Sequence, residues 1–232
     1  MASFSPNGLI NEQAGSRVQT YMSHVYGWMT VGLLLTALVA WFASSNMALI
    51  QLLYKGMWVL LIAELALVFV ISGMINRLSG AAATTLFMLY SVLNGCTFSI
   101  YFKIYTSSSI ASVFFITAGM FGALAFYGYT TKRDLSGFGR FLFMGLIGLV
   151  IASLVNMFTH SDPLMWAITY IGVFVFAGLT AYDTQKLKEL GDGLPQDDQN
   201  IFRRYVILGA LQLYLDFINL FIMLLRIFAD RR

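Results

Sequence analysis

Residues 205–228 read YVILGALQLYLDFINLFIMLLRIF, an apolar run longer than the roughly 20 residues that an α-helix needs to cross a membrane. One carboxylate, Asp216, lies near its middle. An Asp at the centre of a membrane helix costs roughly 2.5–3.5 kcal/mol on insertion scales, so it is expected to face protein or water. Steps of three and four residues place the small and polar side chains of this run on one helical face: Gly209, Gln212, Asp216, Asn219, Met223 and Arg226. The pattern predicts a last helix at the centre of a bundle.

The composition of the whole chain is typical of a membrane protein that crosses the bilayer several times. Of 232 residues, 59% are hydrophobic and 11% are charged, whereas soluble domains carry about 25% charged residues. The apolar runs are continuous and do not alternate, which favours helices over barrel strands. Seven spans are predicted: 25–43, 57–75, 82–102, 110–130, 138–158, 164–183 and 205–228. The predicted fold is therefore an all-α bundle of seven transmembrane helices.

Most connections between these spans are short, which predicts antiparallel neighbours packed into one domain, residues 25–228. Residues 1–24 are then a cytoplasmic N-terminal segment and residues 229–232 a C-terminal tail. The longest connection, 184–204, contains Gly191, Gly193 and Pro195. We expect these residues to break any continuing helix and to leave a solvated loop.

The distribution of lysine and arginine predicts the orientation of the bundle. With the N-terminus in the cytoplasm, nine of the fourteen cations lie on the inner side: Arg17, Arg77, Lys132, Arg133, Arg140, Lys186, Lys188, Arg203 and Arg204. The first apolar run is long and no small-residue cleavage site follows it, which argues against a cleaved signal peptide. The chain is also without a basic run of the kind that binds nucleic acid.

Three acids fall within apolar spans: Glu64, Asp183 and Asp216. Asp183 and Asp216 can lie in the same half of the bilayer, where a low dielectric disfavours two ionised carboxylates and favours a shared proton. The alternative is that neighbouring side chains satisfy each Asp separately. Glu64 has two open readings, a cation ligand or proton acceptor, and a protonated side chain hydrogen-bonded between helices.

A second polar face in the third span carries Tyr90, Asn94, Thr97 and Tyr101 at steps of three and four residues. These side chains could form hydrogen bonds to the seventh helix or line a water-filled path. The single cysteine, Cys96, allows no intramolecular disulfide and is expected to fill space between helices. His24 and His160 lie at span ends without metal-ligand spacing, and we expect no cofactor.

At these residues the chain resembles the Bax inhibitor-1 family, and especially its bacterial inner-membrane members. The resemblance runs from about Gln19 to Phe228. Its most specific stretches are TAYDTQKL at 180–187, LYLDFINLFIMLLRIF at 213–228, KRDLSGFG at 132–139 and YGWMTVGLLLTA at 26–37. The resemblance implies a seven-helix bundle with a central last helix, in a bacterial inner membrane. It also implies that Asp183 and Asp216 form a di-aspartyl pH sensor in a calcium leak pathway, where they could contact the ion.

The second span departs from this family pattern. Family members that leak calcium can carry an acid followed eleven residues later by an arginine that latches the aspartates. Here the residue eleven after Glu64 is Ile75, and the nearest arginine is Arg77. Bacterial relatives are also linked to a membrane-anchored ATP-dependent protease as modulators of its activity, so the resemblance leaves a regulatory role open.

Two functions from different classes follow. The first is a pH-sensitive cation leak, with calcium as the expected ion. The residues expected in its sensor and pathway are Asp183, Asp216, Glu64, Gln212, Asn219, Asn94 and Arg77. The second is a regulatory membrane protein that binds another membrane protein, such as that protease. An intramembrane aspartyl protease is not expected, because its second aspartate follows Gly-x-Gly, whereas Leu213–Leu215 precede Asp216 here.

Overall fold

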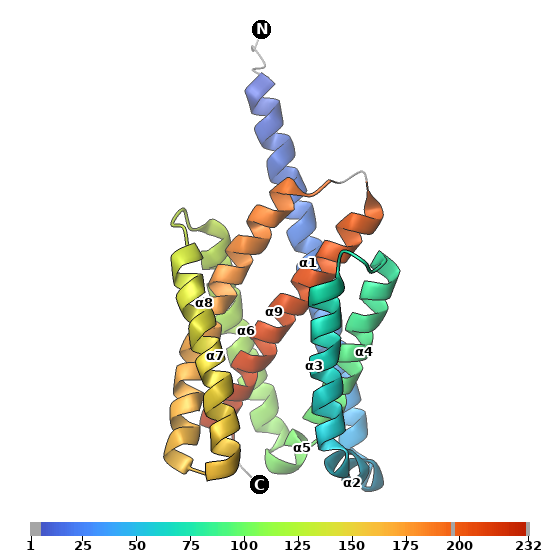
Figure 1. The fold of residues 1–232 in the computed structure, drawn as a ribbon, viewed down its shortest axis with the longest axis vertical. Coiled ribbons are helices and arrows are strands. Elements are labelled where there is room, and N and C mark those ends of the chain that lie inside the picture. The colour runs from blue at the N-terminus through green and yellow to red at the C-terminus, as the bar shows by residue number, and fades with distance from the viewer. Residues whose placement is uncertain (1–5, 196–197, 231–232) are drawn as a thin grey trace. The chain divides into compact units, whose positions relative to one another are not determined.

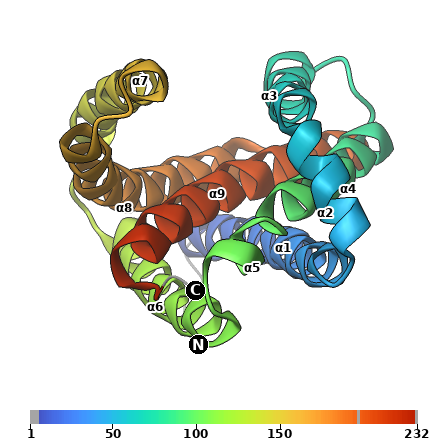
Figure 2. The same cartoon turned by 90° about the horizontal axis from the view of Figure 1, so that it is seen from below.

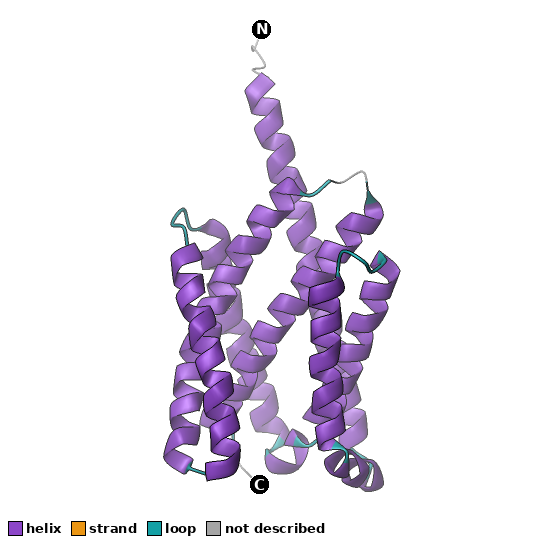
Figure 3. Cartoon of the chain, viewed as in Figure 1, coloured by secondary structure: helices purple, strands orange, loops and turns teal. Residues whose placement is uncertain are grey.

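The computed structural model describes residues 6–195 and 198–230, with side chains from residue 15 onward, and the regular elements in these ranges are α-helices (Figures 1 and 3). They are α1 (Pro6–Ser44), α2 (Met47–Lys55), α3 (Met57–Met74), α4 (Gly80–Phe98), α5 (Tyr101–Ile104), α6 (Ser107–Thr130), α7 (Ser136–Thr159), α8 (Asp162–Gly193) and α9 (Gln199–Phe228). Within these described residues, seven helical stretches are long and apolar enough to cross a membrane, which confirms the predicted fold class. The short helices α2 and α5 were not predicted.

Side chains just before several helices satisfy the backbone N–H groups that have no partner in the first turn. Ser79 accepts a hydrogen bond from the N–H of Ala82 at the start of α4. Asp198 does the same for Asn200 and Ile201 at the start of α9, at 2.9 Å each. At the other end of α7, His160 adopts the left-handed backbone conformation, with φ of 48°, and this ends the helix.

The contacts divide the chain into two compact units. Unit 1 comprises Met1–Ser99 and Lys186–Leu211. In it, α4 packs against both α1 and α3, and α2 contacts the ends of α1 and α3 (Figure 2). The ring of Tyr21, which is 0% exposed, lies against Phe202 of α9, and its hydroxyl donates to the carbonyl of Tyr205 at 3.1 Å. This tyrosine therefore joins α1 to the beginning of α9.

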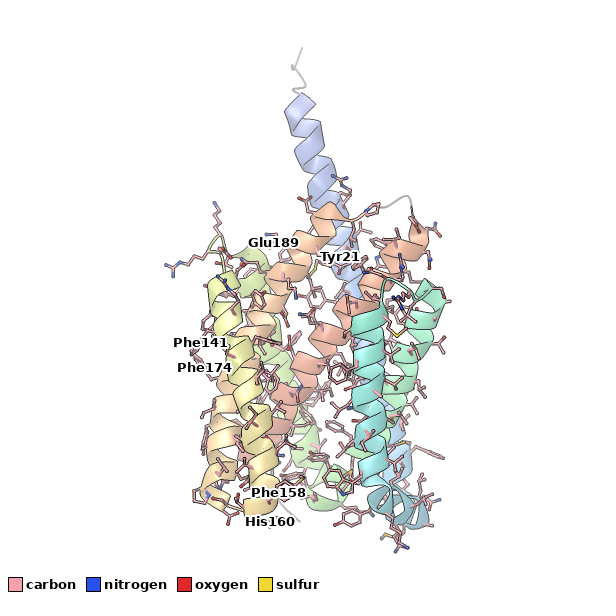
Figure 4. All side chains as sticks on the ribbon, in the orientation of Figure 1. Tyr21, Phe141, Phe158, His160, Phe174 and Glu189 are labelled. Carbon is pink, nitrogen blue, oxygen red and sulfur yellow. The ribbon has the colours of Figure 1, made fainter. Side chains whose placement is uncertain are left out.

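Unit 2 comprises Ile100–Gln185 and Gln212–Arg232. Phe217 of α9 lies edge-on to Phe114 and Phe121 of α6, with ring centroids 5.4 and 5.5 Å apart. On α7 and α8, Phe141 and Phe174 are both 61% exposed, and Figure 4 shows them on the same side of this helix pair. Exposed aromatic side chains on apolar spans are the surface expected to contact lipid.

The last helix, α9, is the most buried of the seven spans, as its polar stripe predicts. In its most apolar stretch 67% of the residues are buried, against 11% in α3 and α7. Its residues up to Leu211 belong to unit 1 and its residues from Gln212 to unit 2. The prediction of a central last helix is confirmed.

The predicted loop at 184–204 is wrong. Helix α8 continues through Gly191 to Gly193, and only a short connection precedes α9. A Cβ added at Gly191 would lie 2.6 Å from the ring of Tyr21, so this glycine makes room for an aromatic side chain on α1. Figure 4 shows Tyr21 near the end of α8 that carries Glu189. Packing against α1 therefore outweighs the weak helix propensity of glycine at this position.

Candidate functional site

The part of α8 that carries Asp183 is packed closely against α6 and α7. A Cβ added at Gly128 of α6 would overlap the carbonyl oxygen of Ala181, and one added at Gly139 of α7 would lie 2.5 Å from the ring of Tyr182. One turn earlier on α8, a Cβ at Gly178 would lie 2.5 Å from Leu142 of α7. Small residues at these positions allow the helix backbones to approach, as in many membrane bundles. They hold this segment of α8 in one position.

Gln185 connects the same segment to the loop between α6 and α7. Its side-chain oxygen accepts a hydrogen bond from the N–H of Leu135 at 2.8 Å, and its side-chain nitrogen donates to the carbonyl of Arg133 at 2.8 Å. The loop belongs to the stretch KRDLSGFG, and Gln185 belongs to TAYDTQKL. Two stretches that lie far apart in the sequence are thus joined by both ends of one amide.

Asp183 and Asp216 are both buried, with 6% and 5% of their surfaces exposed, and both belong to unit 2. Between α8 and α9, a Cβ added at Gly172 would lie 3.0 Å from the sulfur of Met223, so these helices are in contact there. Asp183 is eleven residues after Gly172, and Asp216 is seven before Met223. At 100° per residue, each Asp lies within about 20° of the contact residue on its own helix.

The same contact gives the levels of the two aspartates along the helices. The short connection before α9 makes α8 and α9 antiparallel, so moving from the Gly172–Met223 contact toward either Asp leads in the same direction. Asp183 is eleven residues from this contact and Asp216 is seven. The difference of four residues corresponds to about 6 Å along the helix axis. Helical spacing therefore predicts that both carboxylates lie on the facing sides of α8 and α9, about one helical turn apart in level.

Other polar residues of the predicted α9 stripe are only half-buried. Asn219 donates to the carbonyl of Leu215 one turn earlier at 2.8 Å, so part of its hydrogen-bonding capacity is used within its own helix. Gln212 lies four residues before Asp216. Gln212 is eleven residues before Met223 on α9, and Asp183 is eleven residues after Gly172 on α8. Helical spacing therefore makes Gln212 the residue of α9 nearest in level to Asp183.

Glu64 belongs to a separate polar cluster in unit 1. The hydroxyl of Thr97 on α4 donates to a carboxylate oxygen of Glu64 on α3 at 2.6 Å, and the amide of Asn94 contacts the hydroxyl of Tyr90 at 3.3 Å. Glu64, Asn94 and Thr97 are all buried. Thr97 thus bonds to α3, and not to the seventh helix as one reading of the sequence had it. This hydrogen bond favours the interhelical reading of Glu64.

The fourth residue of the predicted polar face, Tyr101, and the single cysteine, Cys96, complete the third predicted span. Tyr101 begins α5, belongs to unit 2 and stacks on Tyr105 at 6.3 Å. Because α4 ends at Phe98, Tyr101 belongs to a different helix from Tyr90, Asn94 and Thr97. Cys96 is half-buried.

Arg77 is exposed in the turn between α3 and α4. The arginine that binds this turn is Arg204 of α9, whose Nη1 donates to the carbonyl of Asn76 at 2.8 Å, with the carbonyls of Leu78 and Ile75 at 3.4 and 3.5 Å. The hydroxyl of Tyr205 also donates to the side-chain oxygen of Asn76 at 3.1 Å. From the sequence, Arg204 could be counted only as a cytoplasmic cation, since a run of two arginines beside an apolar segment does not indicate which backbone carbonyls they bind.

In the part of the chain that the structure describes, three or more His, Cys, Asp or Glu side chains do not gather into a possible metal site. His160 directly follows α7, as predicted, whereas His24 lies within α1 and not at its end.

Comparisons with known proteins identify the family. A family profile described as inhibitor of apoptosis-promoting Bax1 matches residues 18–232. The chain is 61% identical to the inner membrane protein YbhL of Escherichia coli K12, over 97% of each chain. It is 44% identical to an uncharacterized protein of Borreliella burgdorferi, over 91% of this chain and 92% of that one, and 39% identical to a Rickettsia prowazekii protein, over 96% and 94%. These matches cover nearly the whole length of the chain with its seven spans, so it belongs to the Bax inhibitor-1 family of membrane proteins.

Proposed function

We propose that this protein is a pH-sensitive cation leak of the bacterial inner membrane, with calcium as the expected ion and Asp183 and Asp216 as its gate. The observation that carries the proposal is that both carboxylates are buried, on two spans that are in contact at Gly172 and Met223. Carboxylate oxygens are ligands that calcium prefers. The relative that is 61% identical is an inner membrane protein, which supports the location.

The gate works through the cost of placing two negative charges together in a low dielectric. At low pH the pair shares a proton, and as the pH rises the second deprotonation adds repulsion between α8 and α9. On the α8 side, Gly128, Gly139 and Gln185 hold the helix against α6, α7 and the loop before α7. The repulsion is therefore expected to displace the neighbouring part of α9, and packed interfaces respond to such changes by switching between discrete arrangements.

The test is calcium flux into liposomes that contain the purified full-length protein, measured at several pH values. Asp183→Asn and Asp216→Asn keep the shape of each side chain and remove its titration, so each is expected to abolish the pH dependence. The double variant should add little, because the pair titrates as a unit.

Asp134→Asn is the matched control. Hydrogen bonds from the side chain and backbone N–H of Ser136 hold the pKa of Asp134 below its usual value, so this loop acid stays ionised throughout the neutral range. Its substitution should leave the pH response of the flux unchanged. A full pH response in both Asp183→Asn and Asp216→Asn would refute the gate, and no calcium flux from folded wild-type protein would favour the regulatory function.

A further inference from the structure

A cavity of about 430 Å³ opens between α1 and the beginning of α9, entirely within unit 1. Its lining combines polar side chains with aromatic ones: Thr20, His24, Gln199 and Arg203 with Trp28 and Phe202. A second cavity of about 310 Å³ shares His24 and Trp28 with the first and continues along α1 to Gly27 and Val31. Among the residues that the structure describes, neither lining includes an acid. The two cavities adjoin at His24 and Trp28, with Arg203 on one side and Gly27 and Val31 on the other.

The cationic end lies where two apolar runs begin. Arg203 comes two residues before the run that starts at Tyr205, and His24 comes directly before the run that starts at Val25. Arginine and tryptophan are common at the boundary between the hydrocarbon core and the headgroups. Trp28 lies one turn further along α1 than His24. A ligand here would have one end at headgroup level and the other in the hydrocarbon.

The two cationic or protonatable groups are held in position. Nε of Arg203 donates to the hydroxyl of Thr84 on α4 at 2.9 Å, which uses one of five donors of the guanidinium. Nδ1 of His24 is 2.8 Å from the carbonyl of Thr20, and the ring lies edge-on to Phe202 at 5.6 Å. Because a carbonyl can only accept, Nδ1 carries a proton, and Nε2 on the opposite side of the ring donates to a phosphate oxygen when the ring is doubly protonated.

The acid closest in sequence to this cationic end is Asp198, which directly precedes α9. One of its carboxylate oxygens accepts from the N–H groups of Asn200 and Ile201 at 2.9 Å each. The carboxylate is therefore used to cap α9. Asp198 therefore occupies the N-terminus of α9, and the positive charge that a bound anion would meet in the cavity is that of Arg203.

The apolar end is open at Gly27, where a Cβ would meet no atom within 4 Å. By contrast, a Cβ at Gly32 on the same helix would lie 2.6 Å from the ring of Phe87, so a side chain of α4 already occupies the space beside Gly32. Gly27 therefore borders open space, whereas Gly32 is covered by the ring of Phe87. Gly27 leaves a channel beside Trp28 and Val31 that suits an aliphatic chain.

We propose that these joined cavities bind an anionic phospholipid. Its headgroup phosphate lies at Arg203 and His24, where charge-assisted hydrogen bonds favour a phosphate, and one acyl chain follows Gly27, Trp28 and Val31. The apolar extension and the position at the bilayer boundary select a lipid over free phosphate or a soluble peptide. The site is distinct from the proposed gate, since all its residues belong to unit 1.

The experiment is native mass spectrometry of the purified full-length protein after exchange into detergent with equal amounts of phosphatidylglycerol and phosphatidylcholine of the same acyl composition. Wild type should retain phosphatidylglycerol at least several-fold more. Arg203→Gln should remove this preference, and Gly27→Leu should reduce retention of phosphatidylglycerol by filling the channel. The matched controls Arg140→Gln and Gly148→Leu change an exposed arginine and a glycine with equally open surroundings in unit 2, and both should behave as wild type.

The two test variants probe the charge and the channel separately, so the proposal can be judged if one of them fails to fold. Equal retention of the two lipids by wild type would overturn it. Loss of lipid in the controls to the same extent as in the test variants would also overturn it. Displacement of phosphatidylglycerol by millimolar inorganic phosphate, with no effect of Gly27→Leu, would indicate an anion site and contradict a phospholipid site.

Discussion

Gln185 and Leu135 form a buried hydrogen bond between α8 and the loop that precedes α7, with 2.8 Å between the side-chain oxygen and the backbone nitrogen. The other end of the same amide donates to the carbonyl of Arg133. Asp183 lies only two residues before Gln185. The position of the candidate gate on α8 is thus tied directly to a loop outside the spans.

Replacing Gln185 with Leu should destabilise the protein. The N–H of Leu135 would be left buried without its partner, at a cost of about 1–3 kcal/mol, and the carbonyl of Arg133 would lose its donor. Thermal unfolding of the purified protein in detergent measures the change. Gln51→Leu, at an exposed position of α2, is the control and should leave the midpoint nearly unchanged. An equal midpoint for Gln185→Leu and wild type would contradict a structural role for this amide.

Gly128→Ala and Gly119→Ala form a matched pair on α6 with opposite expected effects. A Cβ at Gly128 would overlap the backbone of Ala181, so the helices must separate, which typically costs about 1–3 kcal/mol. A Cβ at Gly119 meets nothing within 4 Å, so the higher helix propensity of alanine should stabilise the protein by up to about 1 kcal/mol. Unfolding midpoints in the same detergent compare the two. If Gly128→Ala is as stable as Gly119→Ala, the close contact between α6 and α8 is not real.

Arg204→Gln should weaken the attachment of α9 to the turn between α3 and α4, because it removes the charged donor to the carbonyl of Asn76. Hydrogen bonds from charged groups contribute about 1.5–3 kcal/mol, and the lower end applies at this partly exposed site. Arg77→Gln, in the same turn but exposed, should change stability by less than about 0.5 kcal/mol. It should also leave the pH response of calcium flux intact, and loss of that response would restore Arg77 as a candidate latch.

The orientation with the N-terminus in the cytoplasm remains a prediction from the cation count. Reporter fusions that end at Asp134 and at Leu194 should report the cytoplasm, since both residues lie in connections between helices. A fusion after Arg232 should report the other side of the membrane. A cytoplasmic signal from the last fusion would show that the chain crosses the membrane an even number of times.

The sequence alone was sufficient to predict seven membrane helices and a buried last helix, because hydrocarbon requires long apolar helices and forces an intramembrane Asp to face inward. Those constraints act within one helix and can be read from its spacing. The same spacing identified Asp183 and Asp216, which the structure buries. It did not show where α8 ends, since Gly191 remains helical only because Tyr21 of α1 packs on it.

Only the tertiary structure decided which partners the polar residues have. Thr97 bonds to Glu64, Gln185 bonds to the loop before α7, and Arg204 instead of Arg77 binds the α3–α4 turn. Each contact joins residues at least 33 positions apart. A polar side chain in an apolar helix needs a partner, but helical periodicity specifies only the face on which it lies. The identity of the partner depends on which helices come together, and that follows from how all their surfaces pack at once.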